Sequence, residues 1–314
     1  MRIIFFGTPQ FAVPSLEALL AAGHEVVAVV TQPDRPHPRH HTQTVPPPVK
    51  VTATAAGIPV LQPDRPRGDD FYHQLRALNA DLGVVVAYGH LLRPELLAIP
   101  RLGLVNVHAS LLPRWRGAAP IHWAVLSGDA ETGVAIMRLE QGLDTGAVWH
   151  VRRTPILPND TTGTLFTRLA SLGAEALVEA LPRIAAGEAP SPQAEVGVTH
   201  APKVDRTAAR IAWNAPAEAV ANQIRAMDPT PGAWTTLEGQ SVKLFGSRPS
   251  SVLPSVPIDG GTTPGTLHLL PDGPAVSCAE GLLLLADVQP AGKPRMAART
   301  WANGLDPAHG LRFE

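Results

Sequence analysis

The sequence lacks paired cysteines, long apolar runs and a strong net charge, and each absence excludes a class of protein. Its single cysteine, Cys278, cannot form an intramolecular disulfide and fits a reducing cytosol. No segment reaches the roughly 18 uninterrupted apolar residues that a membrane-spanning helix needs, and the apolar run in residues 1–7 is too short for a signal peptide. The formal net charge of -1 argues against a general polyanion binder, although it allows a local basic patch. We therefore expect a cytoplasmic protein without a membrane partner.

The chain is long and apolar enough for two packed domains. It has 314 residues, of which 45% are hydrophobic. A buried strand at residues 2–6, a helix that ends at Gly23 and an apolar strand at residues 25–31 indicate a βαβ unit and hence a parallel sheet. The stretch at residues 7–12 lacks the second and third glycines of a dinucleotide-binding fingerprint, so we interpret it as a tight turn.

The front part of the chain continues this alternation of strands and helices. We expect helices at residues 48–56, 71–78, 121–126 and 162–186, and strands at 58–61, 81–89, 132–139 and 147–154. Residues 187–202 are rich in proline, glycine and glutamate, which is typical of a linker.

The sequence changes character after this linker. Short strands are expected at residues 209–214, 233–237, 241–245, 265–269, 275–278 and 282–287, with one helix at 217–227. This pattern indicates a small OB-like β-barrel. The predicted fold class is therefore α/β, with a Rossmann-like parallel-sheet domain at residues 1–190, a linker at 191–207 and a small OB-like β-barrel domain at 208–314.

Two polar side chains interrupt the apolar strand at residues 104–108. Since successive side chains of a strand point to opposite faces, Asn106 and His108 share one face. In open α/β sheets, ligands bind outside the carboxyl ends of the strands, so we expect this pair beside the loop that follows Ala87. This arrangement indicates a functional site, and a simply solvated strand end is the alternative.

Asp144 lies on a glycine-bounded turn at residues 140–146. Aspartate favours turns through hydrogen bonds of its own side chain, so the position alone does not require a function. No serine or cysteine nucleophile is evident, because Ser110 is better placed to shape a turn; the set therefore suits acyl transfer by direct attack of an amine. Asn106 can donate an N–H to the oxyanion, and His108 can carry the proton from the amine to the leaving nitrogen near neutral pH. Asp144 can orient the imidazole and stabilise its charged form.

Residues 32–48 form a long loop rich in proline, histidine and arginine. Loops of this length inside compact domains are uncommon and often functional. His37, His40 and His41 do not predict a metal site, because no cysteine or spaced carboxylate accompanies them and the flanking prolines prevent the helix that would space the ligands. We therefore interpret the loop as a mildly basic surface loop and expect no metal.

Short motifs spread over nearly the whole chain occur in an order that marks a family. They are residues 2–5, 7–9, 31–36, 84–89, 106–120, 128–134, 142–146 and 289–293. On these motifs the chain resembles the methionyl-tRNA formyltransferases. Within them, Asn-x-His-x-Ser-Leu-Leu-Pro from Asn106 to Pro113, followed by Leu-Asp-Thr-Gly from Leu143, is specific for transferases that use 10-formyltetrahydrofolate.

This resemblance implies a Rossmann-like formyltransferase domain and an OB-like C-terminal domain that contacts tRNA. It implies transfer of the formyl group of the co-substrate 10-formyltetrahydrofolate to the free amino group of initiator methionyl-tRNA, for translation initiation, by a protein that we expect to be monomeric. It assigns catalysis to Asn106, His108 and Asp144. The implied folate-binding residues are Val86, Ala87, Tyr88, Ser110, Leu111, Leu112 and Pro113, and the implied tRNA-binding residues are Arg35, Arg39 and Lys50.

The long loop departs from the family pattern, in which a glycine and a lysine pair commonly accompany its arginine. Here Pro38 stands in place of a glycine, and Arg39 is followed by His40, His41 and Thr42. Fewer permanent positive charges mean fewer phosphate contacts, each of which contributes to salt-dependent affinity.

Three other functions fit parts of the sequence. A formyltransferase acting on an amino sugar nucleotide would share the catalytic set and the folate pocket, but such a small substrate needs no proline-rich basic loop. A folate- or RNA-binding module without catalysis would not need Asn106, His108 and Asp144. A metal-dependent hydrolase would need histidines with ligand spacing, which the loop lacks.

Overall fold

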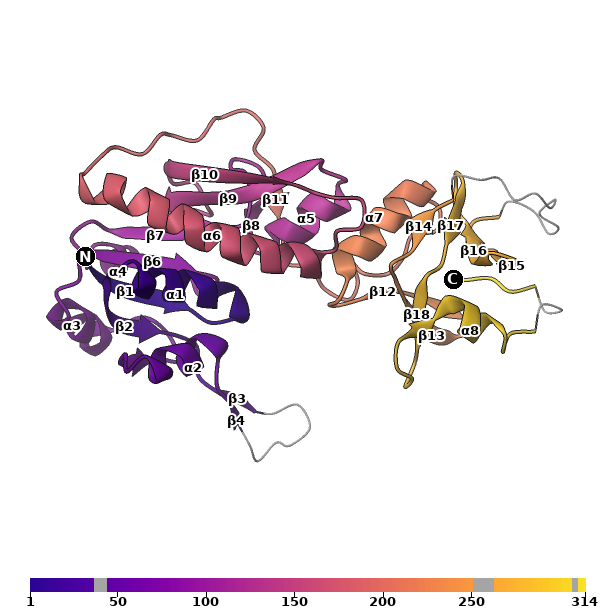
Figure 1. Cartoon of the computed structure of the whole chain (residues 1–314), viewed down its shortest axis with the longest axis horizontal. Helices are drawn as coiled ribbons and strands as arrows, with labels where there is room; N and C mark the ends of the chain where they lie inside the picture. The colour runs from indigo at the N-terminus through magenta and orange to yellow at the C-terminus, as the bar shows by residue number, and fades with distance from the viewer. Residues whose placement is uncertain (37–43, 251–262, 307–309) are drawn as a thin grey trace. The chain divides into compact units, whose positions relative to one another are not determined.

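The structure is a computed structural model that describes residues 1–36, 44–250, 263–306 and 310–314, and the chain forms two compact units (Figure 1). Unit 1 comprises Met1–Pro120, Glu131–Thr154 and Phe166–His200. Unit 2 comprises Ile121–Ala130, Pro155–Leu165 and Ala201–Glu314. The expected domain bounds and the linker at 191–207 stay predictions, but residues up to His200 belong to unit 1.

Unit 1 is built on a seven-stranded sheet with the strand order β10-β9-β7-β6-β1-β2-β5. Its strands are β1 (Arg2–Gly7), β2 (Glu25–Val30), β5 (Val60–Leu61), β6 (Leu82–Val86), β7 (Leu104–His108), β9 (Glu131–Arg138) and β10 (Val148–Pro155). The accompanying helices are η1 (Gln10–Ala12), α1 (Val13–Ala21), α2 (Pro48–Ala55), α3 (Asp69–Ala77), α4 (Pro94–Leu97) and α6 (Thr162–Ala185). Three short strands, β3 (Arg35–Pro36), β4 (Thr44–Val45) and β8 (Arg116–Gly117), lie in the loops.

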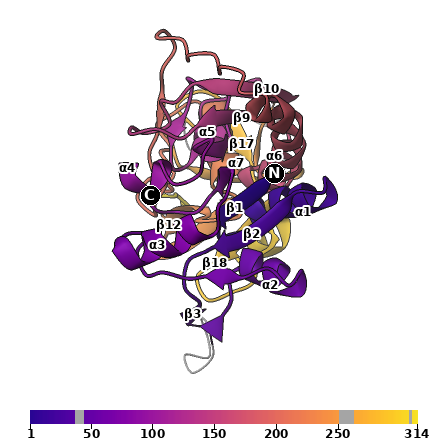
Figure 2. The same ribbon diagram turned by 90° about the vertical axis from the view of Figure 1, so that its left-hand side faces the viewer.

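The central strands of this sheet are apolar because helices cover both of its faces. Figure 2 shows α1 and α6 on one face and α3 and α4 on the other. Ile4 and Phe6 of β1 pack on the second face with Leu75 of α3 and Leu96 of α4. The neighbouring residues of β1 point to the opposite face, so all of its residues from Ile3 to Phe6 are buried.

The order of the parallel strands determines where a ligand can bind. The chain runs from β1 through β2 to β5 in one direction along the sheet, and then from β6 to β7 in the other. Ligand sites in such sheets lie outside the carboxyl ends of the strands, where the order reverses. Val85 of β6 is aligned with Asn106 of β7, so the loop after Ala87 lies beside the end of β7, as predicted.

Unit 2 is an antiparallel β domain, which together with the sheet of unit 1 confirms the predicted two-part fold class. Its two four-stranded sheets have the orders β12-β13-β18-β19 and β14-β17-β16-β15. Their strands are β12 (Ala233–Leu237), β13 (Gln240–Phe245), β14 (Arg248–Pro249), β15 (Leu267–Leu270), β16 (Gly273–Ser277), β17 (Leu282–Leu284), β18 (Asp287–Pro290) and β19 (Met296–Ala297). The remaining elements are α5 (Pro120–Leu126), β11 (His200–Ala201), α7 (Ala217–Met227) and α8 (Ala298–Ala302).

Two expected strands of this part of the chain are wrong. Residues 209–214 make only a single bridge, between Arg210 and Trp234, before a turn begins. The apolar run 282–287 is not one strand, because it serves both sheets: β17 pairs with β16, and Asp287 in β18 pairs with Phe245.

Among the residues that the structure describes, no helix combines the length and the apolar character that a membrane span requires.

Candidate active site

The site forms at the carboxyl end of β7. Asn106 is half-buried and His108 is buried, and both lie on the face that the alternation of the strand predicts. Among the described residues, no hydrogen bond of the Asn106 side chain is present, so its amide can donate to a ligand. The sequence therefore places a polar pair with one available amide beside the loop that follows β6.

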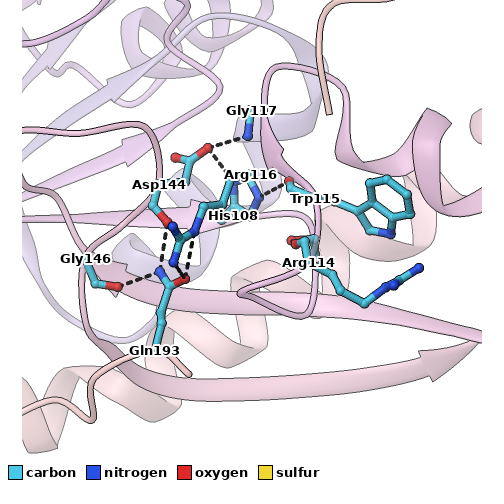
Figure 3. A network of polar contacts seen from close by, with 9 residues as sticks. His108, Arg114, Trp115, Arg116, Gly117, Asp144, Gly146 and Gln193 are labelled. Carbon is cyan, nitrogen blue, oxygen red and sulfur yellow. Dashed lines mark hydrogen bonds and ion pairs between the residues drawn. The ribbon is translucent and has the colours of Figure 1, made fainter. Parts of the chain in front are cut away.

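His108 is held between a carbonyl and a carboxylate (Figure 3). Its Nε2 lies 3.0 Å from the carbonyl oxygen of Trp115, and because a carbonyl can only accept, Nε2 is the donor. Its Nδ1 lies 3.6 Å from Oδ2 of Asp144. The same Oδ2 accepts the backbone N–H of Gly117 at 2.8 Å. The structure thus brings together two residues, His108 and Asp144, that are far apart in the sequence.

Asp144 occupies a constrained turn. Its backbone φ of +52° lies in the left-handed region, which aspartate tolerates better than most residues. A side chain at Gly146 would meet the carbonyl oxygen of Arg138 at 1.9 Å, so only glycine fits there. The carboxylate is 13% exposed and therefore largely withdrawn from water. Asp144 is thus more than a solvated turn residue, because the turn directs its carboxylate at His108.

The sequence interpretation missed two residues at this site, Gln193 and Thr199. The amide nitrogen of Gln193 donates to the carbonyls of Asp144 and Gly146, both at 2.8 Å (Figure 3). The hydroxyl of Thr199 accepts the backbone N–H of Trp115 at 2.9 Å. Both residues lie in the segment expected to be a linker, whose composition gives no signal of these contacts.

The loop after β6 is one of the two segments that the sequence predicts to hold the folate. Ala87 has a positive φ of +47°, and the carbonyl of Tyr88 accepts hydrogen bonds from the Thr8 hydroxyl and the Gln32 amide at 3.2 and 3.0 Å. The Tyr88 ring is buried against Phe6, and burial raises the pKa of its hydroxyl to about 12. The tyrosine side chain therefore belongs to the core, so a ligand at Tyr88 would meet the backbone of this residue.

The second expected folate segment, Ser110 to Pro113, follows β7. Ser110 is buried and its hydroxyl donates to the carbonyl of Arg114 at 2.6 Å, which confirms that this serine shapes a turn. Leu111, Leu112 and Pro113 are half-buried. Their apolar side chains lie directly after the strand that carries His108.

The expected tRNA-binding residues differ in their surroundings. Arg35 is exposed and donates to the Gln32 side chain at 2.6 Å. The Lys50 ammonium donates to both carboxylate oxygens of Asp34 at 2.8 Å. Hydrogen bonds from Gln62 and then from Lys50 lower the pKa of Asp34. Arg39 lies outside the described residues.

Within the part of the chain that the structure describes, no three side chains of the metal-binding types come together. His37, His40 and His41 of the long loop lie outside these residues.

Comparison with known proteins agrees with this geometry. The family model described as formyl transferase matches residues 1–181, and the one described as formyl transferase, C-terminal domain, matches residues 203–306. The chain therefore belongs to the formyl transferase family. The seven-stranded sheet and the polar end of β7 lie in the part of the chain that matches the formyl transferase model, so they belong to a formyl transferase domain.

The relatives narrow the class further. The chain is 47% identical to the methionyl-tRNA formyltransferase of Acidothermus cellulolyticus, over the full length of both chains. It is 48% identical to that of Symbiobacterium thermophilum, over 100% of this chain and 95% of the relative. These relatives confirm the resemblance to methionyl-tRNA formyltransferases that the motifs indicate.

Solved structures share the fold. A sugar 3N-formyl transferase, WlaRD, determined in the presence of dTDP and 5-N-formyl-THF, matches with a TM-score of 0.68 at 17% identity, over 94% of this chain and 99% of that one.

Proposed function

We propose that this protein transfers the formyl group of 10-formyltetrahydrofolate to the amino group of initiator methionyl-tRNA, in the cytoplasm and as a monomer. The observation that carries the proposal is the similarity to methionyl-tRNA formyltransferases over the whole chain, including the C-terminal part. The polar set at the end of β7 supports the reaction type. Its members, Asn106, His108 and Asp144, are suited to acyl transfer without a covalent enzyme intermediate.

The reaction forms one C–N bond and breaks another. The co-substrate supplies the formyl group, and the amine of the methionyl residue attacks the formyl carbon. The Asn106 amide donates to the formyl oxygen as negative charge develops on it. His108 accepts the proton from the attacking nitrogen and returns it to the leaving nitrogen, so that the proton count balances.

The contacts of His108 indicate which of its two ring nitrogens acts on the substrate. Nδ1 faces the Asp144 carboxylate, which leaves Nε2 to act on the substrate. In the structure Nε2 carries a proton and donates it to the Trp115 carbonyl, so this contact has to open and the proton has to leave Nε2, for example to Nδ1 beside Asp144, before Nε2 can accept the proton of the amine. Hydrogen bonds of catalytic groups commonly rearrange in this way when the substrate binds.

We assign folate binding to the backbone at Val86, Ala87 and Tyr88 and to the segment from Ser110 to Pro113. The first segment has backbone strain at Ala87 and follows a strand at the reversal point of the sheet. The second offers half-buried apolar side chains, which suit a flat aromatic ring system.

We assign tRNA binding to the long loop and to Lys50 in the helix α2 that follows it, with unequal roles for these cations. Arg35 is exposed, whereas the Lys50 charge is compensated by Asp34. A protein cation that neutralises a phosphate releases counterions from the nucleic acid, and Lys50 would first have to give up its carboxylate partner, so Arg35 contributes more than Lys50. Arg39 is assigned from its sequence position alone.

An amino sugar nucleotide is the second candidate substrate, because WlaRD, a sugar 3N-formyl transferase, shares the fold. At 17% identity that likeness concerns the fold alone. The test is a formyl-transfer assay with 10-formyltetrahydrofolate in which methionyl initiator tRNA and an amino sugar nucleotide are offered in parallel. We expect formylation of the tRNA only. Formylation of the sugar only would keep the catalytic set and reject the tRNA substrate, together with the roles of Arg35, Arg39 and Lys50.

A further inference from the structure

Gln193 stands out in the segment that follows α6. From Ser191 to Gly197 the segment is exposed except at Gln193, which is half-buried. The segment is anchored before this residue, where Ser191 and Val148 exchange two backbone hydrogen bonds of 2.8 and 2.9 Å. It is anchored again at Thr199, whose carbonyl accepts the N–H of Arg116 at 2.9 Å. The segment therefore crosses the site with one side chain turned inward.

The side-chain amide of Gln193 connects two loops of the site (Figure 3). Its nitrogen donates to the carbonyls of Asp144 and Gly146. Its oxygen accepts from Nε and Nη2 of Arg116 at 3.1 and 2.7 Å. An amide group has two N–H donors and two acceptor lone pairs, so all of its capacity is used. A surface glutamine that is hydrogen-bonded only to water would not be held in one orientation by contacts of this kind.

Both connected loops carry a group that contacts His108. One loop is the turn with Asp144, whose carboxylate faces Nδ1. The other loop contains Trp115, whose carbonyl accepts the hydrogen bond from Nε2, and Arg116, which follows Trp115 in the sequence. Gln193 thus joins the two walls between which the imidazole lies.

The turn needs such support. Asp144 has a left-handed backbone, and conformations of this kind persist where the surrounding structure imposes them. The two carbonyls that Gln193 binds lie at Asp144 itself and two residues later. Without the amide, these carbonyls lose their donor and the turn loses a constraint on the direction of its carboxylate.

We propose that Gln193 is a positioning residue that fixes the Asp144 turn against the Arg116 loop and thereby orients His108 for proton transfer. This inference rests on the proposed formyl transfer for its kinetic consequence. It does not make Gln193 a catalytic residue, because Gln193 acts through Asp144. Misplacing a catalytic group by about 1 Å lowers rates by up to roughly 100-fold.

The test uses two substitutions in the full-length protein. Gln193→Glu keeps the acceptor for Arg116 but cannot donate to the two carbonyls, and Gln193→Ala removes both connections without adding a charge. We expect both variants to lower kcat about 10- to 100-fold while KM for tRNA and for the folate stays within about 3-fold, since a displaced proton carrier affects the chemical step. Glu195→Gln, an exposed position on the same segment, is the matched control and should act like the parent.

A double-variant comparison separates positioning from general structural damage. In an Asp144→Asn background, Gln193→Ala should lower single-turnover transfer by less than about 3-fold, because the group that it positions is already disabled. An equal loss in both backgrounds, or an unchanged kcat in both Gln193 variants, would overturn the inference.

A second readout does not depend on activity. The N–H of Gly117 donates to the Asp144 carboxylate, so its hydrogen exchange reports the position of that carboxylate. We expect faster exchange of this amide in Gln193→Glu and in Gln193→Ala, and parent-like exchange in Glu195→Gln. Unchanged exchange would reject the positioning role. If the parent protein does not formylate methionyl-tRNA, the proposed function fails, and this exchange measurement still decides on Gln193.

Discussion

Each of the two units buries a histidine, and their neighbours differ. His108 of unit 1 is 5% exposed and faces the Asp144 carboxylate and a backbone carbonyl. His268 of unit 2 is 8% exposed, and its Nε2 lies 2.8 Å from the Ser277 hydroxyl. Burial lowers the pKa of His268, because the cation is poorly solvated there. The two histidines are similarly buried, so the proposed role of His108 as a proton carrier rests on its carboxylate partner and on its place at the carboxyl end of β7.

The largest expected effect separates the two histidines directly. His108→Ala should lower formyl transfer about 10²- to 10⁴-fold, which is the usual contribution of a general acid–base. His268→Ala should leave kcat near that of the parent while lowering the stability by about 1–3 kcal/mol, because the Ser277 hydroxyl loses its partner. Steady-state kinetics and thermal unfolding of both variants check this. If kcat fell by a similar factor in both variants, the proposed difference between His108 and His268 would be wrong.

A smaller kinetic effect is expected at the other polar residue of β7. Asn106→Ala should lower kcat about 10²- to 10³-fold, the range seen when one oxyanion donor is removed. Because the Asn106 amide has no partner within the described residues, the folded state should be little affected. Transfer kinetics and the melting temperature measure the two consequences. Parent-like kcat would show that another group binds the oxyanion.

The smallest expected effect concerns stability and pH in unit 2. The folded-state pKa of His268 lies below its ordinary value of 6.5. The unfolded chain therefore binds this proton more readily, and the stability contributed by the neutral form is lost as the pH falls below about 6.5. His268→Gln cannot be protonated, so it should lose less stability than the parent between pH 7.5 and pH 5, by at most about 1.4 kcal/mol per pH unit.

Melting curves of the parent and of His268→Gln across this pH range provide the measurement. Burial also lowers the pKa values of His24 and His122, so the parent slope includes more than one histidine and only the difference between the two proteins is diagnostic. Parallel curves would show that His268 does not contribute.

The sequence predicts the parallel sheet and the polar strand end well, for a physical reason. Strands that are buried on both faces, such as β1 and β6, are continuous apolar runs, and a strand fixes the faces of Asn106 and His108 by alternation. The resemblance to formyltransferases then supplies Asp144. These features depend on local pattern or on motifs that stand together in the chain.

What the sequence did not predict depends on the path of the chain in space. Gln193 lies among exposed residues of a proline- and glutamate-containing segment, and only the return of that segment across the site brings it to Asp144. The run 282–287 looks like one strand because both sheets of unit 2 need apolar side chains, although Leu284 and Asp287 pair with different strands. Neither the contacts of Gln193 nor the division of the run 282–287 between two sheets produces a periodic pattern in the sequence.

The most direct test of the account is the single-turnover transfer rate of the double variant His108→Ala/Asp144→Asn. If Asp144 acts through His108, the double variant should be about as slow as His108→Ala alone, because groups that act as a unit have strongly non-additive effects. If the losses of the two single variants multiply instead, the carboxylate and the imidazole act independently, and the arrangement seen between them does not carry the catalysis.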